Sequence, residues 1–310
     1  MKRNIEHTAM VAVAGSGVVW GIYWIPLRAL TDAGVSGAWA VFLFYLIPTL
    51  LLLPIYFLRW RNLMRGGLPL NFSGMLAGAS LVLYAGALIF TDVVQALLLY
   101  YLTPLWSTLL ARVTIGETIS ATRWVTIGLG LVGLMIVLEL DAGFYWTFNV
   151  GDVMGLAAGI VWALAAVRMR SDDKNNGLDF TLSYFAWGSF AALLLTSLPQ
   201  AGTYSAPDWQ TVVNVLPWLV PVVGFLVVPP AFAVMWGATL LSPGLLGILF
   251  MTEISAGVVT AAIWAGELFG LREITGIGVI SLAGLWEPVI GLVKASPWTK
   301  NLTAGCDRRS

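Results

Sequence analysis

The chain has 310 residues, of which 59% are hydrophobic and only 10% are charged, and its formal net charge at pH 7 is zero. Soluble domains carry about 25% charged residues, so this composition excludes a water-soluble globule and indicates a protein that lies in a bilayer. His7 is the only histidine and Cys306 the only cysteine, which excludes a histidine-based catalytic triad, a multi-histidine metal site and an intrachain disulfide.

Ten charge-poor segments follow one another along the chain, and each is close to the roughly 20 apolar residues that one membrane helix needs. The expected helices cover residues 8–27, 36–58, 71–91, 93–111, 121–139, 152–169, 179–199, 211–234, 241–265 and 273–293. Residues 209–252 contain no charged side chain and are about twice as long as one span, so we expect two helices there, with the break between Gly237 and Pro243. The predicted fold is therefore an all-α integral membrane protein with ten transmembrane helices.

The positions of Lys and Arg indicate the orientation of these helices. With the N-terminus in the cytoplasm, 14 Lys and Arg residues fall on the cytoplasmic side, and only Arg28 and Arg272 fall outside. Cytoplasmic loops of membrane proteins carry such an excess of positive charge. We therefore expect both termini to be cytoplasmic, with residues 294–310 forming a cytoplasmic tail.

Two short motifs occur twice, at matching places in the two halves of the chain. Residues 17–20 (GVVW) in the first expected helix align with residues 159–162 (GIVW) in the sixth. Residues 115–118 (IGET), after the fourth helix, align with residues 265–268 (AGEL), after the ninth. A single Gly-Glu pair after an apolar run would indicate only the exit of a helix, but two matched pairs favour an internal repeat.

This repeat divides the chain into a first five-helix unit at residues 1–141 and a second one at residues 142–293. Because five is an odd number of spans, the second unit enters the membrane in the opposite orientation. Paired units of opposite orientation are a common basis of alternating access in transporters. The match with the sixth helix also indicates that the first helix is retained rather than cleaved as a signal peptide.

Three features together carry a resemblance to a known family. They are residues 101–104 (YLTP), the apolar helix that ends with Gly-Glu at residues 116–117, and the next helix, which begins with Trp-x-x-x-Gly at residues 124–128. This pattern resembles the drug/metabolite transporter superfamily in its EamA-like form, which has ten helices in two repeats. The resemblance covers residues 8–293 and implies a secondary transporter.

Within that superfamily, the aromatic residues Trp20, Tyr84, Tyr101 and Trp162 make the chain most similar to the bacterial aromatic amino-acid exporters of the YddG type. The similarity implies a multi-pass protein of the bacterial inner membrane. Such a protein would export amino acids, with neutral and aromatic ones favoured, by alternating access through a central cavity. The chain departs from those exporters in its ninth helix, where residues 251–253 (MTE) stand in place of a proline-centred motif.

Glu253 lies about midway along the ninth expected helix. An ionised carboxylate at that depth costs about 2.5–3.5 kcal/mol on insertion scales, so we expect it to face a wet cavity, to pair with a cation or to be protonated. This position suits proton coupling or the binding of an amine, and it makes multidrug efflux of aromatic cations an alternative function. A neutral Glu253, hydrogen-bonded inside the bundle, is the structural alternative.

The deeper aromatic residues are candidates for the cavity wall, because a ring inside the bundle offers stacking to an apolar substrate and an N–H or O–H to its polar end. These candidates are Trp20, Tyr84, Tyr101, Trp162, Trp187 and Trp236. Ordinary packing is the alternative for each of them. Pro104 interrupts the fourth helix and is a candidate helix break or gating point, because proline frees a backbone carbonyl.

The sequence contains no glycine-rich phosphate-binding loop, so we expect no ATP hydrolysis within this chain. An integral-membrane enzyme, for example one acting on lipid, would need clustered His, Asp, Ser or Cys near an interface, and the sequence shows only scattered carboxylates such as Asp172 and Asp173. We therefore expect no enzymatic activity and no cofactor. A channel is a further alternative, but no selectivity filter is recognisable.

Two modes of transport are left open: facilitated diffusion without energy coupling, and transport coupled to proton exchange through Glu253. The expected partners are a small-molecule substrate, such as an amino acid or similar metabolite, and the lipid bilayer, with protons in the exchange case. We expect no nucleic acid and a monomeric protein.

Overall fold

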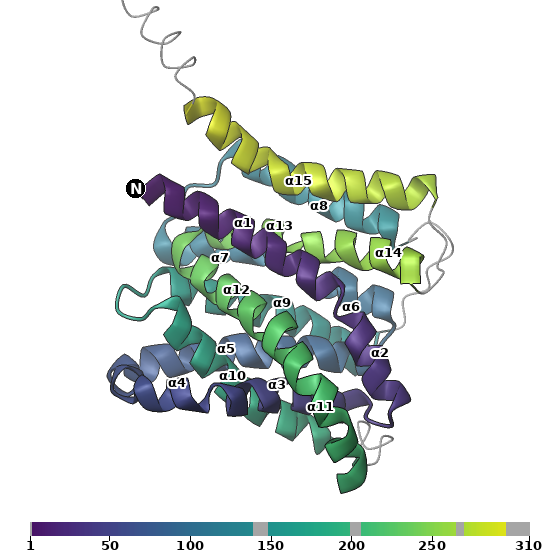
Figure 1. Ribbon diagram of the computed structural model, residues 1–310. Coiled ribbons are helices and arrows are strands. Elements are labelled where there is room, and N and C mark those ends of the chain that lie inside the picture. Colours follow the sequence, from purple (N-terminus) through teal and green to yellow (C-terminus); the bar gives the residue numbers. More distant parts are fainter. Residues whose placement is uncertain (1, 139–147, 199–205, 265–269, 296–310) are drawn as a thin grey trace, which may run out of the picture.

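The computed structural model describes residues 2–138, 148–198, 206–264 and 270–295 (Figure 1). Within these residues every helix or strand assigned is an α-helix, and seven helices or helix pairs are long and apolar enough to cross a membrane. The all-α prediction is therefore confirmed, and the chain is a multi-pass membrane protein. The tail beyond residue 295 and the second Gly-Glu motif, at residues 266–267, lie outside the described residues.

The helices follow the predicted segments closely. The first half contains α1 (Lys2–Gly21), α2 (Trp24–Asp32), α3 (Gly37–Leu51), α4 (Leu53–Leu58), α5 (Trp60–Phe90), α6 (Val93–Tyr100), α7 (Thr103–Ile115) and α8 (Ala121–Val137). The second half contains α9 (Val150–Arg170), α10 (Gly177–Thr196), α11 (Trp209–Leu226), α12 (Val228–Leu240), α13 (Pro243–Phe250), α14 (Thr252–Trp264) and α15 (Leu271–Ala295). Each predicted segment coincides with one helix or with two consecutive ones. The count of ten spans stays a prediction, because α3 and α8 are shorter than a full span and α15 is not among the seven candidate spans.

Five predicted spans are broken into two helices, and proline explains four of the breaks. Prolines lie at or near the start of α2, α4, α7 and α12, at Pro26, Pro54, Pro104 and Pro229. A proline has no N–H to donate to the carbonyl four residues earlier, and its ring clashes with that carbonyl. The span therefore bends at this point. The break between α13 and α14, at Met251, has no proline in its first turn.

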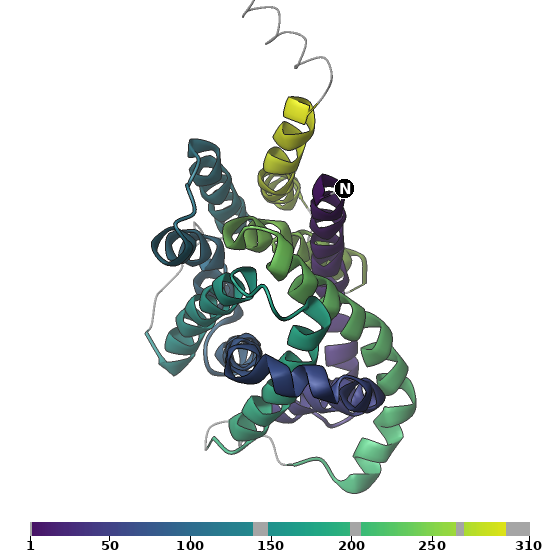
Figure 2. The ribbon, with the colours of Figure 1, turned by 90° about the vertical axis from the view of Figure 1, so that its left-hand side faces the viewer.

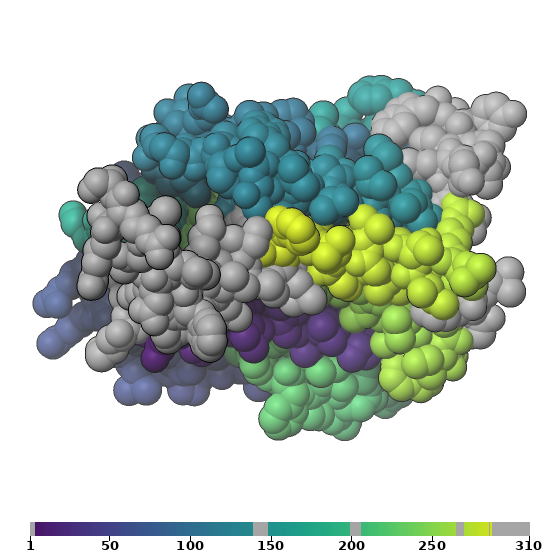
Figure 3. All heavy atoms as spheres, turned by 90° about the horizontal axis from the view of Figure 1, so that it is seen from above, coloured from purple at the N-terminus to yellow at the C-terminus, as the bar shows by residue number. Residues whose placement is uncertain are grey.

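The helices form one bundle in which α5 packs between α9 and α10, and α3 packs against α10. On the other side of α9, α7 packs against both α9 and α13, and α1 packs against α12 and α14. Figure 2, which looks at the end of the bundle that carries the N-terminus, shows this arrangement along the helix axes. Helices α8 and α15 pack against each other and form one face, as Figure 3 shows from above.

Glycine allows the closest approach between α1 and α14. A Cβ atom at Gly21 would lie 2.6 Å from the Cβ atom of Ala256 and 2.7 Å from the backbone nitrogen of Gly257. The carbonyl of Gly21 accepts a hydrogen bond of 3.3 Å from the hydroxyl of Thr260. Small residues of this kind permit backbone contact between membrane helices, where the hydrophobic effect does not drive association.

Arg59, between α4 and α5, fixes one end of the bundle. Its guanidinium group donates to both carboxylate oxygens of Asp179, at 2.7 and 2.9 Å. Asp179 lies in the first turn of α10 and is buried. The hydroxyl of Tyr56 also donates to the carbonyl of Leu182. These contacts join the end of the second predicted span to the start of the seventh.

We expect Gly21→Ala to destabilise the bundle by about 1–3 kcal/mol, because the added methyl group meets backbone atoms of α14 that have no room to move. Gly15→Ala is the matched control, because no heavy atom lies within 4 Å of a Cβ at that position. The measurement is the thermal midpoint of unfolding of the detergent-purified protein, with size-exclusion chromatography to read the fraction that remains unaggregated after heating. Equal midpoints for the two variants would contradict the close contact.

Candidate functional site

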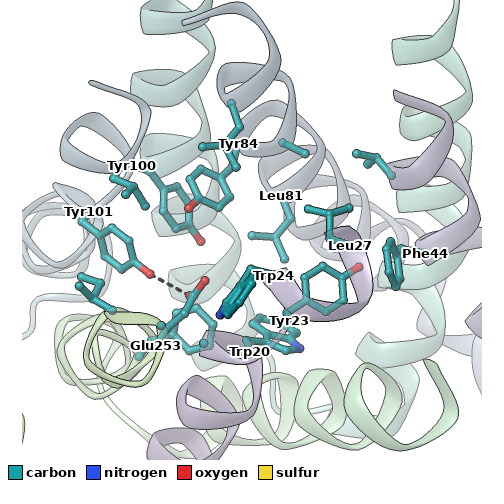
Figure 4. A pocket seen from close by; sticks show the side chains of 18 of the residues that line it. Trp20, Tyr23, Trp24, Leu27, Phe44, Leu81, Tyr84, Tyr100, Tyr101 and Glu253 are labelled. Carbon is teal, nitrogen blue, oxygen red and sulfur yellow. Dashed lines mark hydrogen bonds between the residues drawn. The ribbon is translucent and has the colours of Figure 1, made fainter. Parts of the chain in front are cut away.

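A cavity of about 410 Å³ lies in the middle of the bundle, between the broken spans (Figure 4). Its walls come from α1 and α2, α3, α5, α6, α8, α10, α13 and α14. Its volume falls in the range of about 300–1,000 Å³ that is typical of small-molecule sites. Aromatic and aliphatic side chains form most of the lining, with a few polar groups among them.

The break between α1 and α2 brings a row of side chains to the cavity. Trp20, Tyr23, Trp24 and Leu27 are three or four residues apart, so they share one face of the broken span, and all four line the cavity. The ring of Trp20 packs edge-on against Phe250, with 5.1 Å between the centroids. The indole N–H of Trp24 donates to the hydroxyl of Thr260 at 3.0 Å, which ties α2 to α14.

Three tyrosines from α5 and the break between α6 and α7 form another part of the wall. The rings of Tyr84 and Tyr100 stack, with 4.2 Å between the centroids and 23° between the planes. Tyr101 meets Tyr100 edge-on at 5.3 Å. Because Tyr100 ends α6 and Tyr101 lies in the break itself, the bend turns both adjacent side chains toward the same cavity.

Glu253 faces these tyrosines from the second residue of α14, just after the break at Met251. Its Oε2 atom accepts a hydrogen bond of 2.8 Å from the hydroxyl of Tyr101 (Figure 4). A carboxylate in the first turn of a helix is stabilised by the free N–H groups there. The break therefore does more than bend the span, because it provides a helix start inside the bilayer at which an acidic side chain is tolerated.

In the described part of the chain, the cavity lining contains an acidic side chain and no basic one. Among the lining residues, all of which the structure describes, Glu253 is the only acid, and there is no Lys, Arg or His. Arg28 and Asp32 line an adjoining, more open hollow, which shares Trp24 with the cavity. A ligand in the cavity therefore meets one carboxylate, several hydroxyl and indole groups and a large apolar surface.

The cavity is closed toward the end of the bundle that carries the N-terminus, where α7 packs against α13. A Cβ atom at Gly247 would lie 3.1 Å from Pro104, and one at Gly244 would lie even closer to Thr108. The guanidinium of Arg123 donates to the hydroxyl of Ser242 at 2.9 Å. At the opposite end, the cavity reaches the last turns of α5 and α8.

Four of the seven residues that the sequence singled out for the cavity meet there: Trp20, Tyr84, Tyr101 and Glu253. The other three lie elsewhere. Trp162 is buried in the core around α9, and Trp236 packs against Gly177 at the start of α10. Trp187 donates its indole N–H to Asn71 at 3.1 Å on an exposed part of the surface. Pro104 does not line the cavity; it is the second residue of α7, three residues after the lining residue Tyr101.

Sequence reasoning missed several lining residues. They are, among others, Tyr23, Trp24, Phe44, Tyr45, Tyr100, Tyr184 and Phe250. The spacing of Trp20, Tyr23, Trp24 and Leu27 was a usable signal, because residues three and four apart share a helix face. The contact between the hydroxyls of Tyr45 and Tyr184, at 3.0 Å, joins residues 139 apart and had no signal in a single sequence.

Comparisons with known proteins point to transport. Residues 7–139 match the model of the EamA-like transporter family. An uncharacterized transporter of Synechocystis sp. is 26% identical, with 96% of this chain and 97% of that protein covered. An uncharacterized transporter of Archaeoglobus fulgidus is 25% identical over 65% of this chain and 69% of its own length. A riboflavin transporter of Vibrio cholerae is 26% identical over 40% of this chain and 38% of its own length.

One solved crystal structure has the same fold, with a TM-score of 0.70 and coverage of 94% of this chain and 99% of that one. Its sequence is only 16% identical, so this likeness concerns the fold alone. Together, the comparisons and the apolar helices indicate a membrane transporter rather than an enzyme. The aromatic amino-acid exporter subtype and the bacterial inner membrane stay predictions.

We expect Tyr101→Phe to lower the stability of the protein by about 1.5–3 kcal/mol, because the carboxylate of Glu253 loses a charge-assisted hydrogen bond while the ring is kept. Tyr100→Phe is the matched control, since its hydroxyl makes no hydrogen bond to any side chain in the part of the chain that the structure describes. Thermal midpoints in detergent measure both effects. A larger loss from Tyr100→Phe would contradict the role of the Tyr101 hydroxyl.

Proposed function

We propose that the chain is an EamA-like secondary carrier, which moves a small amphipathic molecule across the membrane by alternating access. The cargo has an amino group and an apolar or aromatic body. The resemblance to amino-acid exporters makes amino acids one such class, and amines are the other. The observation that carries this proposal is the partly buried carboxylate of Glu253, held between two broken spans in an aromatic cavity.

The shape of the cavity supports a carrier. It lies midway along the spans, it is large enough for a small molecule, and it is closed toward one end by the packing of α7 against α13. Carriers that expose one site alternately to the two sides place that site near the midplane, at helix breaks. The closed end would be cytoplasmic if the distribution of Lys and Arg gives the correct orientation.

Matched contacts at the two breaks support the inverted repeat. Gly17, in α1, packs against Thr252 at the break between α13 and α14. Gly159, the counterpart of Gly17 in the sequence repeat, packs in the same way against Thr103, with 3.0 Å from a Cβ to the hydroxyl oxygen. Each threonine hydroxyl donates to the carbonyl three residues earlier, at Leu249 and Tyr100.

The neighbours of each helix follow the same symmetry. Helix α9 packs against α5 and α7, and its counterpart α1 packs against α12 and α14. The pairs α3 with α10 and α8 with α15 join each helix to its own counterpart, and α7 with α13 joins the second half of the fourth span to the first half of the ninth. Under alternating access, the two units rock about these symmetric pairs. The contact of α7 with α13 then opens, and α6 closes against α14 at the other end.

Glu253 also offers a site for proton exchange. A carboxylate that binds either the amino group of the cargo or a proton couples the movement of the two. The titratable groups that face it across the cavity are the hydroxyls of Tyr84, Tyr100 and Tyr101, and none of these carries a positive charge. Export of the cargo against its gradient would then use the inward movement of protons.

We expect Glu253→Gln to reduce counterflow of amino-bearing cargo at least about tenfold, because the charge that binds the amino group is removed. The assay uses purified protein in proteoliposomes with radiolabelled Phe, Trp, Leu, Ala and Thr and a quaternary aromatic cation. It is run with and without a pH gradient, to which only the parent should respond.

Glu273→Gln is the matched control for this experiment. Glu273 lies at the start of α15, outside the cavity, where it accepts a hydrogen bond from the backbone of Gly270 at 2.6 Å. Its amide replacement should transport like the parent. Full transport by Glu253→Gln would show that this residue is not the cargo site, although the carrier could still stand.

We expect a cysteine at Leu88 to react with an impermeant maleimide from the outside of intact cells, because Leu88 lines the cavity near the end of α5. A cysteine at Thr118, in the exposed turn between α7 and α8, should react only from the inside. Both are made in a Cys306→Ser background, since Cys306 is the only native cysteine. The opposite labelling pattern would contradict the orientation, and added cargo should slow labelling at Leu88 alone.

A further inference from the structure

We infer that the cavity selects a monocationic amine and discriminates against the corresponding α-amino acid. The inference rests on the proposed carrier function and names the class of its cargo: an aromatic or apolar body with one ammonium group and no carboxylate. It therefore favours aromatic amines over the amino acids to which the sequence resemblance points.

The first step is the charge of the lining. Glu253 has the only carboxyl group among the described lining residues, and these include no Lys, Arg or His. A charge in an apolar site needs a partner, because an unpaired buried ion is strongly unfavourable. An ammonium group finds this partner in Glu253. A carboxylate on the cargo would find none.

The second step follows from the structure of an α-amino acid. Its ammonium and carboxylate groups are attached to the same carbon atom, so an ammonium bound to Glu253 brings the carboxylate of the cargo close to that of the protein. Two like charges a few ångströms apart repel each other strongly in a medium of low dielectric constant. The corresponding amine, which lacks the carboxylate, avoids this repulsion.

The start of α14 does not solve the problem for an amino acid. The N-terminus of a helix attracts anions, but here the acidic side chain of the helix itself, Glu253, lies in the first turn. At the other broken span, the second residue of α7 is Pro104, which has no N–H to offer. Arg28 does not line the cavity but lines the adjoining hollow, where Asp32 accompanies it.

The third step is the aromatic wall around the carboxylate. Trp20, Trp24, Tyr84, Tyr100 and Tyr101 line the same cavity as Glu253 (Figure 4). The faces of such rings attract cations, with Trp the strongest. The rings therefore favour the same charge that Glu253 favours, and they also offer apolar surface to the body of the cargo.

Three ligands with the same phenyl body separate the possibilities. They are phenylalanine, phenylalaninamide, which keeps the amine and removes the carboxylate charge, and the trimethylammonium derivative of 2-phenylethylamine, which does not cross the bilayer by itself. Binding to the purified full-length protein is measured by isothermal titration calorimetry, and exchange is measured by counterflow in proteoliposomes. Parent and Glu253→Gln are compared, with Glu273→Gln as the control.

We expect the amide and the quaternary amine to bind the parent at least about tenfold more tightly than phenylalanine. This preference should be lost in Glu253→Gln and kept in Glu273→Gln. Preference of the parent for phenylalanine, or equal binding of the three ligands, would overturn the inference, while counterflow of phenylalanine would leave the carrier function in place. Absence of counterflow for every ligand, together with equal labelling of the Leu88 cysteine from both sides, would overturn the proposed function as well.

Discussion

The constraint on which this structure depends is that a backbone broken inside a bilayer must satisfy its freed polar groups within the protein. The carbonyl of Tyr100, freed by Pro104, accepts the hydroxyl of Thr103. Thr252, at the matching break, lies within hydrogen-bonding distance of the carbonyls of Ala14 and Leu249. Neighbouring helices cover these breaks by close glycine contacts, and the bent spans leave a central cavity between them.

The two breaks are alike in position but differ in chemistry. After the matched threonines, the first unit has Pro104 and the second has Glu253. At the first break, Pro104 bends the span, and its missing N–H removes one donor from the start of α7. At the second break, Glu253 places a carboxylate in the first turn of α14, where the helix N-terminus stabilises it. In the proposed repeat, the two units would share the geometry of the break, and only the second would carry the binding group.

The helices could be predicted from the sequence because the bilayer imposes both their length and their apolar character. The cavity lining could be predicted only in part. Trp20 and Trp162 match in the repeat, yet only Trp20 lines the cavity, because the rotation of a helix is set by its packing. Tyr23 and Trp24 were missed because the first segment was expected to end near residue 27. Helix α2 continues to Asp32, which places both residues deeper.

In the proposed cycle, the same two broken spans provide both the binding site and the gate. Helices α7 and α13 pack together at Pro104 and Gly247, between the cavity and its closed end. Tyr101, at the break before α7, donates a hydrogen bond to Glu253 at the start of α14, which joins the two spans at the cavity. A ligand that binds Glu253 competes for the carboxylate that Tyr101 holds. It therefore changes the free energy of the contact between these spans directly. A ligand shifts a conformational equilibrium only through its different affinity for the two states. In this protein the ligand would act on the gate through the Tyr101–Glu253 contact itself, without a chain of intermediate residues.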